Sequence, residues 1–424
     1  MYSFLWSFIC FSLQFHELSA EKSSPTHFIK DQHLDKHEFP PPLGKAPKGV
    51  PQGHLRPLGF QRTADGRIRG MRKDIASPGN FTFRFVSRRE ACFFNDYYKS
   101  PANEKWGDKY LAQTYPNETV TVVKKDRKEG YVEATMNFKQ FLKSYHIEEW
   151  RIQDTPLPES MKADLAMPVT LQCQLHKDHF QHMKLWMSSG PNVSPIFYSR
   201  DDTFRCVLAG RLDYIVVKSQ YNDSFEITEQ YSDQEVVGKS RINHEQINLF
   251  TYPAISKISW QWATLNAPAC IFVPAGYVQQ FTAYGRSVAI TFAVSSFPAY
   301  DKCNKTEVDH YLSLLSVDSL WKFENGLWDL KAENWNGSVI RRYLDSFVQR
   351  EGELKKERFV HFFNLAAKKS RLESRDADQA WKSLGGKKTF IDAEEYKQIS
   401  DSDIDYLAKV INSKLSGVPL REEL

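Results

Sequence analysis

The stretch Ser194-Pro195-Ile196-Phe197-Tyr198-Ser199, followed by the apolar run Phe204-Arg205-Cys206-Val207-Leu208-Ala209-Gly210, is the part of the sequence that decides the fold. Short apolar runs that end at Pro or Gly are typical of β-strands joined by tight turns. Similar runs lie on both sides of this stretch, and few helical patterns separate them. Many short strands with few helices between them predict a β-barrel or jelly roll. The predicted strands are Val169–Cys173, Met183–Met187, Phe204–Leu208, Asp213–Val217, Cys270–Val273, Val278–Tyr284 and Ser287–Val294.

Helical periodicity flanks the β-rich segment. Apolar side chains spaced i, i+3, i+4 and i+7 predict an amphipathic helix over residues 137–147. From about residue 305 the period is helical again, which predicts a helical C-terminal region. Its last helix would be capped by Ser402 with Asp405 and ended by Gly417. The apolar stripes are Phe138, Phe141, Leu142 and Tyr145, then Ile340, Tyr343, Leu344 and Phe347, then Phe359, Phe362, Phe363 and Ala366, and finally Ile404, Leu407, Ile411 and Leu415.

Composition and pattern divide the 424 residues into segments. This length allows one large domain and a smaller one, because domains typically hold ~100–200 residues. The predicted segments are a signal peptide (1–20), an irregular leader rich in Pro and His (21–75), the β-rich domain (76–300), the helical region (301–420) and a short tail (421–424).

Both ends of the sequence point to the secretory pathway. The apolar run from Phe4 to Phe15 is shorter than the ~20 residues that span a bilayer, but it suits the core of a signal peptide. The tail Arg421-Glu422-Glu423-Leu424 is similar to signals that retrieve proteins to the endoplasmic reticulum (ER). We therefore expect a resident of the ER lumen that binds the retrieval receptor through this tail. No later run approaches 18 apolar residues, so no transmembrane helix is expected.

Sequons and charge bear on modification and partners. Six Asn-x-Ser/Thr sequons agree with passage through the ER, and Asn192 is the one least expected to carry a glycan. The net charge is only +4 and Lys and Arg are scattered, which argues against a nucleic-acid partner. The expected partner is an unidentified protein of the ER lumen. The other candidate glycosylation sites are Asn80, Asn117, Asn222, Asn304 and Asn336.

Five cysteines remain once the predicted signal peptide, with Cys10, is removed. An odd number in an oxidising compartment implies at least one free thiol or an intermolecular bond. Cys206 and Cys270 lie in apolar strand-like runs, so we expect them to be buried thiols. Any disulfide would then come from Cys92, Cys173 and Cys303, with the pairing left open.

Several of these stretches, in this order, resemble the heart of JmjC-type (cupin-like) 2-oxoglutarate oxygenases. The resemblance covers roughly residues 80–300. It implies a double-stranded β-helix that holds Fe(II) with two His and one carboxylate, leaving coordination positions open for 2-oxoglutarate and O₂. The stretches are Leu185-Trp186-Met187-Ser188-Ser189-Gly190, Ser194–Ser199, Phe204–Gly210, Tyr252–Trp260, Ala269–Gly276 and Tyr284-Gly285-Arg286.

The resemblance also implies that the metal chemistry is missing. The family's first His and its carboxylate correspond to Phe197 and Ser199, and the distal His corresponds to Gln279. A co-substrate Lys lies fifteen residues after the first His, where this chain has Leu212, and Ser194 is a second vestigial co-substrate position. A phenyl ring offers no lone pair, and a hydroxyl and an amide are weak ligands compared with imidazole and carboxylate. We therefore expect no catalytic residue, no metal and no cofactor, although the family would use Fe(II) and 2-oxoglutarate.

Two other patterns suggest metal sites without completing one. His176-Lys177-Asp178, with His179 and His182 close behind, is a literal His-x-Asp, but it precedes the tryptophan-containing strand, where the family has no ligand. We expect it to be a solvent-exposed edge or turn. The segment from Trp381 to Tyr396 resembles a degenerate EF-hand, yet Lys387 and Lys388 stand where a calcium loop needs acidic or amide side chains.

Three hypotheses for function follow. The first is a non-catalytic JmjC-like protein of the ER lumen that acts as a binding or scaffold protein, with its former metal pocket either open or filled. The second is a 2-oxoglutarate-dependent hydroxylase or demethylase with unorthodox metal ligands, acting on secretory-pathway proteins. The third is a scaffold that uses the helical region. Its phenylalanines would either face a partner or form that region's own core, and they are Phe347, Phe359, Phe362 and Phe363.

Overall fold

A computed structural model describes residues 37–72, 76–126, 130–296, 303, 307–330, 335–367, 374–386 and 388–416. The predicted signal peptide and the tail 421–424 lie outside these residues. So do the sequon at Asn304, the expected helix end at Gly417, and Lys387.

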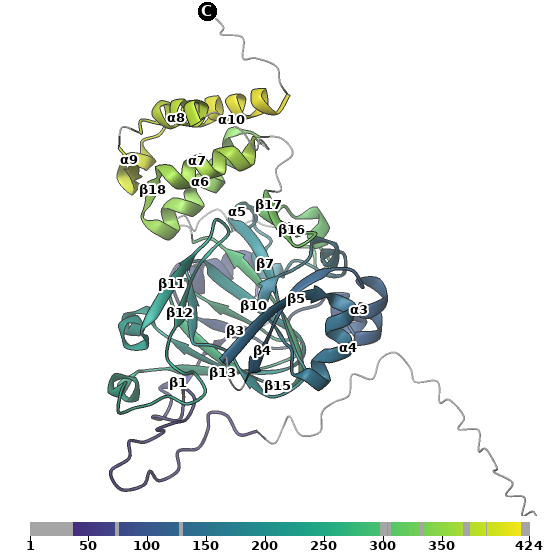
Figure 1. Cartoon of the computed structure of the whole chain (residues 1–424), viewed down its shortest axis with the longest axis vertical. Coiled ribbons are helices and arrows are strands. Elements are labelled where there is room, and N and C mark those ends of the chain that lie inside the picture. The colour runs from purple at the N-terminus through teal and green to yellow at the C-terminus, as the bar shows by residue number, and fades with distance from the viewer. Residues whose placement is uncertain are drawn as a thin grey trace, which may run out of the picture. The chain divides into compact units, whose positions relative to one another are not determined.

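Two long antiparallel strands, β10 (Asp202–Val217) and β15 (Val278–Val294), organise a large mixed sheet of 13 strands (Figure 1). The main path of the sheet runs β11-β12-β9-β15-β10-β14-β3-β2, and the other members attach to its sides. Within the described residues the pairings do not close into a barrel. The remaining strands are β1 (Gly66–Arg67), β2 (Arg69–Gly70), β3 (Cys92–Phe94), β6 (Ile152–Pro156), β7 (Phe180–Ser188), β8 (Asn192–Val193), β9 (Phe197–Ser199), β11 (Ile227–Tyr231), β12 (Val236–Ser240), β13 (Gln261–Asn266) and β14 (Cys270–Val273).

The predicted mainly-β architecture, with flanking helices and a helical C-terminal region, is confirmed. Separate two-stranded sheets are β4 (Thr119–Asp126) with β5 (Gly130–Asn137), β16 (Trp321–Glu324) with β17 (Leu327–Leu330), and β18 (Glu353–Lys355) with β19 (Phe390–Asp392). The helices are α1 (Pro78–Phe81), α2 (Ala102–Lys105), α3 (Asp108–Thr114), α4 (Phe138–Glu148), α5 (Gln174–Asp178), α6 (Gly337–Glu351), α7 (Lys356–Ala366), α8 (Ser374–Ser383), α9 (Ala393–Lys397) and α10 (Asp401–Ser416). Within the described residues no helix is long and apolar enough to cross a membrane.

In the structure two pairs of predicted strands each form one continuous strand, and one predicted strand is a turn instead. Gly210 was expected to break a strand, but its φ of 80° instead accompanies a bulge within β10, so the runs before and after it form one strand. Likewise β15 continues through Gly285, whose φ is 60°. The predicted strand Val169–Cys173 is wrong, because residues Val169–Leu171 form a 3₁₀ turn after Pro168.

The predicted helices fit the described residues well. Helix α4 begins after Asn137, which forms a capping box with Gln140, and its four predicted apolar side chains are buried. The cap of α10 differs from the expected pair, because the Ser400 hydroxyl, rather than Ser402, accepts the backbone N–H of Asp403. Ser400 with Asp403 and Ser402 with Asp405 have the same spacing, so the sequence pattern alone does not distinguish the two possible caps.

The disulfides require a correction. Cys206 and Cys270 were expected to remain thiols, but the β10–β14 register places them directly opposite each other and they are bonded. Cys173 is bonded to Cys303, which agrees with the predicted donor set. Cys92 is the free cysteine among the described residues, and burial raises the pKa of its thiol. The error arose because apolar surroundings predict burial but do not reveal which strand lies alongside.

The C-terminal helices form their own core. Two helix–strand–helix units, α6-β18-α7 and α8-β19-α9, are joined by antiparallel pairing of β18 with β19. The phenylalanines considered as a partner surface are all buried in this core: Phe347, Phe359, Phe362 and Phe363. This placement removes the observation that favoured a phenylalanine docking surface on this region.

A buried ion pair links this helical region to the large sheet. The guanidinium of Arg350, on α6, donates from Nε to Asp201 (3.0 Å) and from Nη2 to Gln181 (2.8 Å). The side chains of Arg350 and Asp201 are 2% and 1% exposed, so neither charge is solvated. Burial raises the pKa of Asp201, while Arg350 opposes that shift.

The first prediction concerns the cysteines. Peptide mapping of unreduced protein after alkylation should recover the pairs Cys206–Cys270 and Cys173–Cys303, with Cys92 alkylated only after unfolding. A Cys92-containing disulfide, or free Cys206 in the folded protein, would contradict the strand register described above.

The second prediction concerns the buried ion pair. Asp201→Ala should lower the free energy of unfolding by about 3–5 kcal/mol, because it leaves the Arg350 charge buried without its partner. Urea denaturation measures this. The control is Lys397→Ala, which removes an ion pair whose side chains are 67% and 80% exposed and should change little. Equal effects of the two variants would contradict the linking role of Arg350.

Candidate functional site

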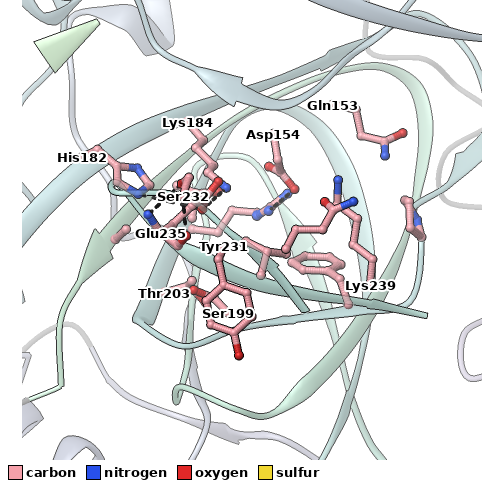
Figure 2. A pocket seen from close by; sticks show the side chains of 17 residues that line it. Gln153, Asp154, His182, Lys184, Ser199, Thr203, Tyr231, Ser232, Glu235 and Lys239 are labelled. Atoms are coloured by element: carbon pink, nitrogen blue, oxygen red, sulfur yellow. Dashed lines mark hydrogen bonds and ion pairs between the residues drawn. The ribbon is translucent and has the colours of Figure 1, made fainter. Parts of the chain in front are cut away.

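A cavity of about 240 Å³ lies among strands β6, β7, β9, β10, β12 and β15 (Figure 2). We call it the polar cavity, because ionic and hydroxyl side chains line much of it. Strand β7 supplies His182 and Lys184, two residues apart, and β10 supplies Thr203 and Arg205 in the same way. Alternate residues of a strand point to one face of the sheet, so each pair reaches the same space.

Two of the three positions that the resemblance assigns to metal ligands line this cavity, and the third lies beside it. Phe197 and Ser199, on β9, line it. Gln279, on β15, pairs with Phe197 in the sheet register, and its amide nitrogen is 3.5 Å from the hydroxyl of the lining residue Thr203. The β9–β15 pairing therefore brings together positions that are 82 residues apart in sequence.

The two positions that the resemblance assigns to the co-substrate do not line the cavity. Leu212 is fully buried among apolar side chains of the sheet interior, and it does not line the cavity. The Ser194 hydroxyl accepts the backbone N–H of Phe281 at 2.9 Å, which is a structural role. Leu212 therefore belongs to the apolar core of the sheet.

These residues do not fit a bound Fe(II). Phe197 has no donor atom, and the Ser199 hydroxyl accepts the N–H of Asp201 at 3.0 Å. Within the described residues, one group of three could approach a metal ion, Cys173 with His176 and Cys303, and its two cysteines are joined as a disulfide. It includes no residue of the polar cavity, so the facial triad has no replacement there.

Two ion pairs that the sequence did not predict lie in the cavity. Arg205 donates to Asp154 at 2.7 Å, and its guanidinium carbon lies 4.5 Å from the Phe281 ring centroid. Lys184 forms an ion pair with Glu235. Burial alone would raise the pKa of Glu235, but Lys184, His182 and Arg350 together outweigh this, and the pKa is lowered. Each acid is thus paired with a cation inside the cavity.

Asp154 is held in an unusual backbone conformation. Its φ is 51°, in the left-handed region, and the β6–β7 register shifts between Ile152 and Thr155. Asp is one of the residues that tolerates this region, and bulges commonly re-aim a side chain beside a functional site. Here the bulge accompanies a carboxylate that contacts Arg205 inside the cavity.

The segment around His176-Lys177-Asp178 was expected to be a solvent-exposed edge or turn, but His176 and the following His182 are both buried. His176 is 2% exposed on the short helix α5, with its Nε2 2.8 Å from the Thr82 hydroxyl. His182 is 1% exposed and lines the cavity, whereas His176 and Asp178 do not. Burial lowers the pKa of His182 to about 3, so its ring is neutral at physiological pH.

Several buried polar atoms of the cavity residues have no hydrogen-bond partner in the described structure. They belong to a guanidinium, an imidazole, a carboxylate and a hydroxyl. Buried polar groups are normally paired, and unpaired ones call for an unseen ligand or water. The atoms are Arg205 Nε and Nη1, His182 Nδ1 and Nε2, Asp154 Oδ1 and Thr291 Oγ1.

The rim of the cavity is tied to the C-terminal helices. Tyr231, Ser232 and Glu235 lie in the β11–β12 hairpin and line the cavity. Between them, Asp233 pairs with Arg358 at 3.2 Å and with His361 at 2.7 Å, both on α7. The position of the rim therefore depends on contacts with the helical region.

The candidate glycosylation sites differ in exposure. Asn80, Asn117 and Asn336 are exposed, although the Asn336 side chain accepts the N–H of Val339 as the cap of α6. Asn222 and Asn192 are half-buried, and each donates its amide to a glycine carbonyl at 3.1 Å.

Comparison with known proteins supports the fold of this segment. A family model described as a cupin-like domain matches residues 78–294, slightly more than half of the chain. No curated protein matches the chain.

The third prediction concerns acid stability. Between pH 6.5, near the unfolded pKa of His, and about 3, the folded pKa of His182, only the unfolded chain takes up this proton. The free energy of unfolding contributed by this group therefore falls as the pH falls through that range. His182 faces Glu235, Lys184, Arg350 and Lys162.

His182→Gln should reduce the slope of unfolding free energy against pH between pH 7 and 4, measured by urea denaturation at each pH. His310→Gln, a change at an exposed position, should leave the slope unaltered. An unaltered slope in the His182 variant would contradict a neutral buried imidazole.

Proposed function

The chain belongs to the cupin-like domain family, and from this premise we propose that it is a non-catalytic member that binds a ligand. The single observation that carries the proposal is the polar cavity, where Phe197 and Ser199 put an aromatic ring and a hydroxyl at two of the positions that the resemblance assigns to metal ligands. The third such position, Gln279, is an amide on the paired strand β15. The cavity is open, so a ligand has room.

Electrostatics supports the same reading. Divalent iron is held in this family by a carboxylate and two imidazoles. The acids of the cavity, Asp154 and Glu235, are each already paired with a cation. The one imidazole, His182, shares the cavity with Lys184 and Arg205, which would repel a metal cation. The cavity therefore favours a ligand that is not a metal cation.

We further propose that the protein resides in the ER lumen and works beside an unidentified lumenal protein. This location is supported by the apolar run Phe4–Phe15 of the predicted signal peptide, by the tail Arg421–Leu424 and by the exposed sequons. The alternative hypothesis, a 2-oxoglutarate-dependent hydroxylase or demethylase with unorthodox ligands, would need a relocated triad. His176 and Asp178 do not line the polar cavity, so they do not provide one there.

The fourth prediction tests the absence of the metal site. Titration of the purified protein with Mn(II), as a stand-in for Fe(II), and 2-oxoglutarate should show no micromolar binding that requires both. The matched control is the triple variant Phe197→His, Ser199→Asp and Gln279→His, which restores the family's ligands and should gain Mn(II) affinity by at least about tenfold. Binding by the unaltered protein that requires both components would refute the proposal.

A further inference from the structure

We propose that the polar cavity binds a small carboxylate that also carries a hydroxyl or amine group. This inference rests on the proposed ligand-binding function and names the chemistry of the ligand. It is drawn from the ionic side chains and unpaired polar atoms of the cavity, and from its size.

The size of the cavity limits the ligand. Sites for drug-sized molecules enclose roughly 300–1,000 Å³. The polar cavity is smaller, at about 240 Å³. A small metabolite fits this volume, whereas a peptide segment of several residues or a nucleotide does not.

The charges of the lining favour an anion. Three cations, Lys184, Arg205 and Lys239, face two acids, Asp154 and Glu235. Arg205 and Lys184 are each paired with one of these acids. Lys239 is exposed and has no ion-pair partner among the described residues, so one positive charge is left over at the cavity. A single carboxylate would balance it.

The unpaired donors specify where an anion would be held. Only one guanidinium nitrogen of Arg205, Nη2, is used by Asp154, while Nε and Nη1 are unpaired. The side chain of Arg205 is 4% exposed, so these donors are cut off from bulk water. Guanidinium and carboxylate form strong charge-assisted hydrogen bonds, and the planar guanidinium suits a planar carboxylate.

The unpaired acceptor specifies the second group of the ligand. Oδ1 of Asp154 accepts no hydrogen bond, and it can accept one from a hydroxyl or an ammonium. Thr291, opposite Arg205 in the β10–β15 register, adds a hydroxyl that is also unpaired. A plain carboxylate would leave the Asp154 oxygen unsatisfied, which costs free energy in a buried site. A hydroxy- or amino-carboxylate satisfies both the unpaired donors of Arg205 and the unpaired acceptor of Asp154.

The fifth prediction tests this chemistry by isothermal titration of the full chain. L-lactate is the probe, propionate lacks its hydroxyl, and lactamide lacks its charge. Lactate should bind, propionate should bind about tenfold more weakly, and lactamide should not bind measurably.

Arg205→Gln should weaken lactate binding by about 10- to 100-fold, the range for losing a charge-assisted hydrogen bond. The matched control is Arg211→Gln, which breaks another buried Arg–Asp pair on the same strand, β10, away from the cavity. It should keep the unaltered affinity. If Arg205→Gln fails to fold, Lys239→Glu at the exposed rim provides the second test and should also weaken lactate binding.

Each other outcome overturns the inference. Equal binding of lactate and lactamide, binding of inorganic phosphate but not lactate, or no binding of any probe would each exclude a hydroxy- or amino-carboxylate site. These results leave the proposed function standing, because that proposal fails only if Mn(II) and 2-oxoglutarate bind together.

Discussion

The antiparallel pairing of β10 with β15 is the constraint on which the rest of the structure depends. Along this pair, Arg205 stands opposite Thr291, and the neighbouring residue Phe204 stands opposite Phe292. Because successive side chains point to opposite faces, the first pair faces the polar cavity and the second packs into the apolar core with Cys206. A shift of one residue would exchange the two faces, placing the charges in the core. The register therefore fixes both the core and the cavity.

The sequence predicts the features that are local and misses those that depend on register. The capping box and apolar stripe of α4 lie within one segment, so their pattern is readable. The Cys206–Cys270 bond joins strands 64 residues apart, and no local pattern identifies that neighbour. The Arg205–Asp154 pair was missed for the same reason, although the spacing of His182 and Lys184 on one strand was a usable signal for an ionic face. The resemblance supplies the register between strands, and for this reason it could group Phe197 with Gln279, which do pair across β9 and β15.

Buried ion pairs in the cavity need a reason beyond stability. Removing two charges from water often costs as much as their attraction returns, so a hydrophobic pair of similar size would serve a core as well. Apolar side chains could fill this space as stably as ionic ones. The cavity instead contains Arg205 and Lys184 with their acids, and Asp154 has a φ of 51°. Strained, ionic and partly unpaired groups are features of binding sites more than of filled cores.

The C-terminal helices bear directly on the cavity. Arg350 fixes Asp201 at the start of β10, and its Nη1 donates to the backbone carbonyl of Asp233 in the rim hairpin. Arg358 and His361 hold the side chain of the same aspartate. Glu235, two residues further on, carries the ion pair with Lys184 inside the cavity. A displacement of α6 or α7 would therefore move the residue that neutralises Lys184 and change the charge presented to a ligand. The helical region thus supports the rim of the polar cavity, although its own aromatic side chains are buried.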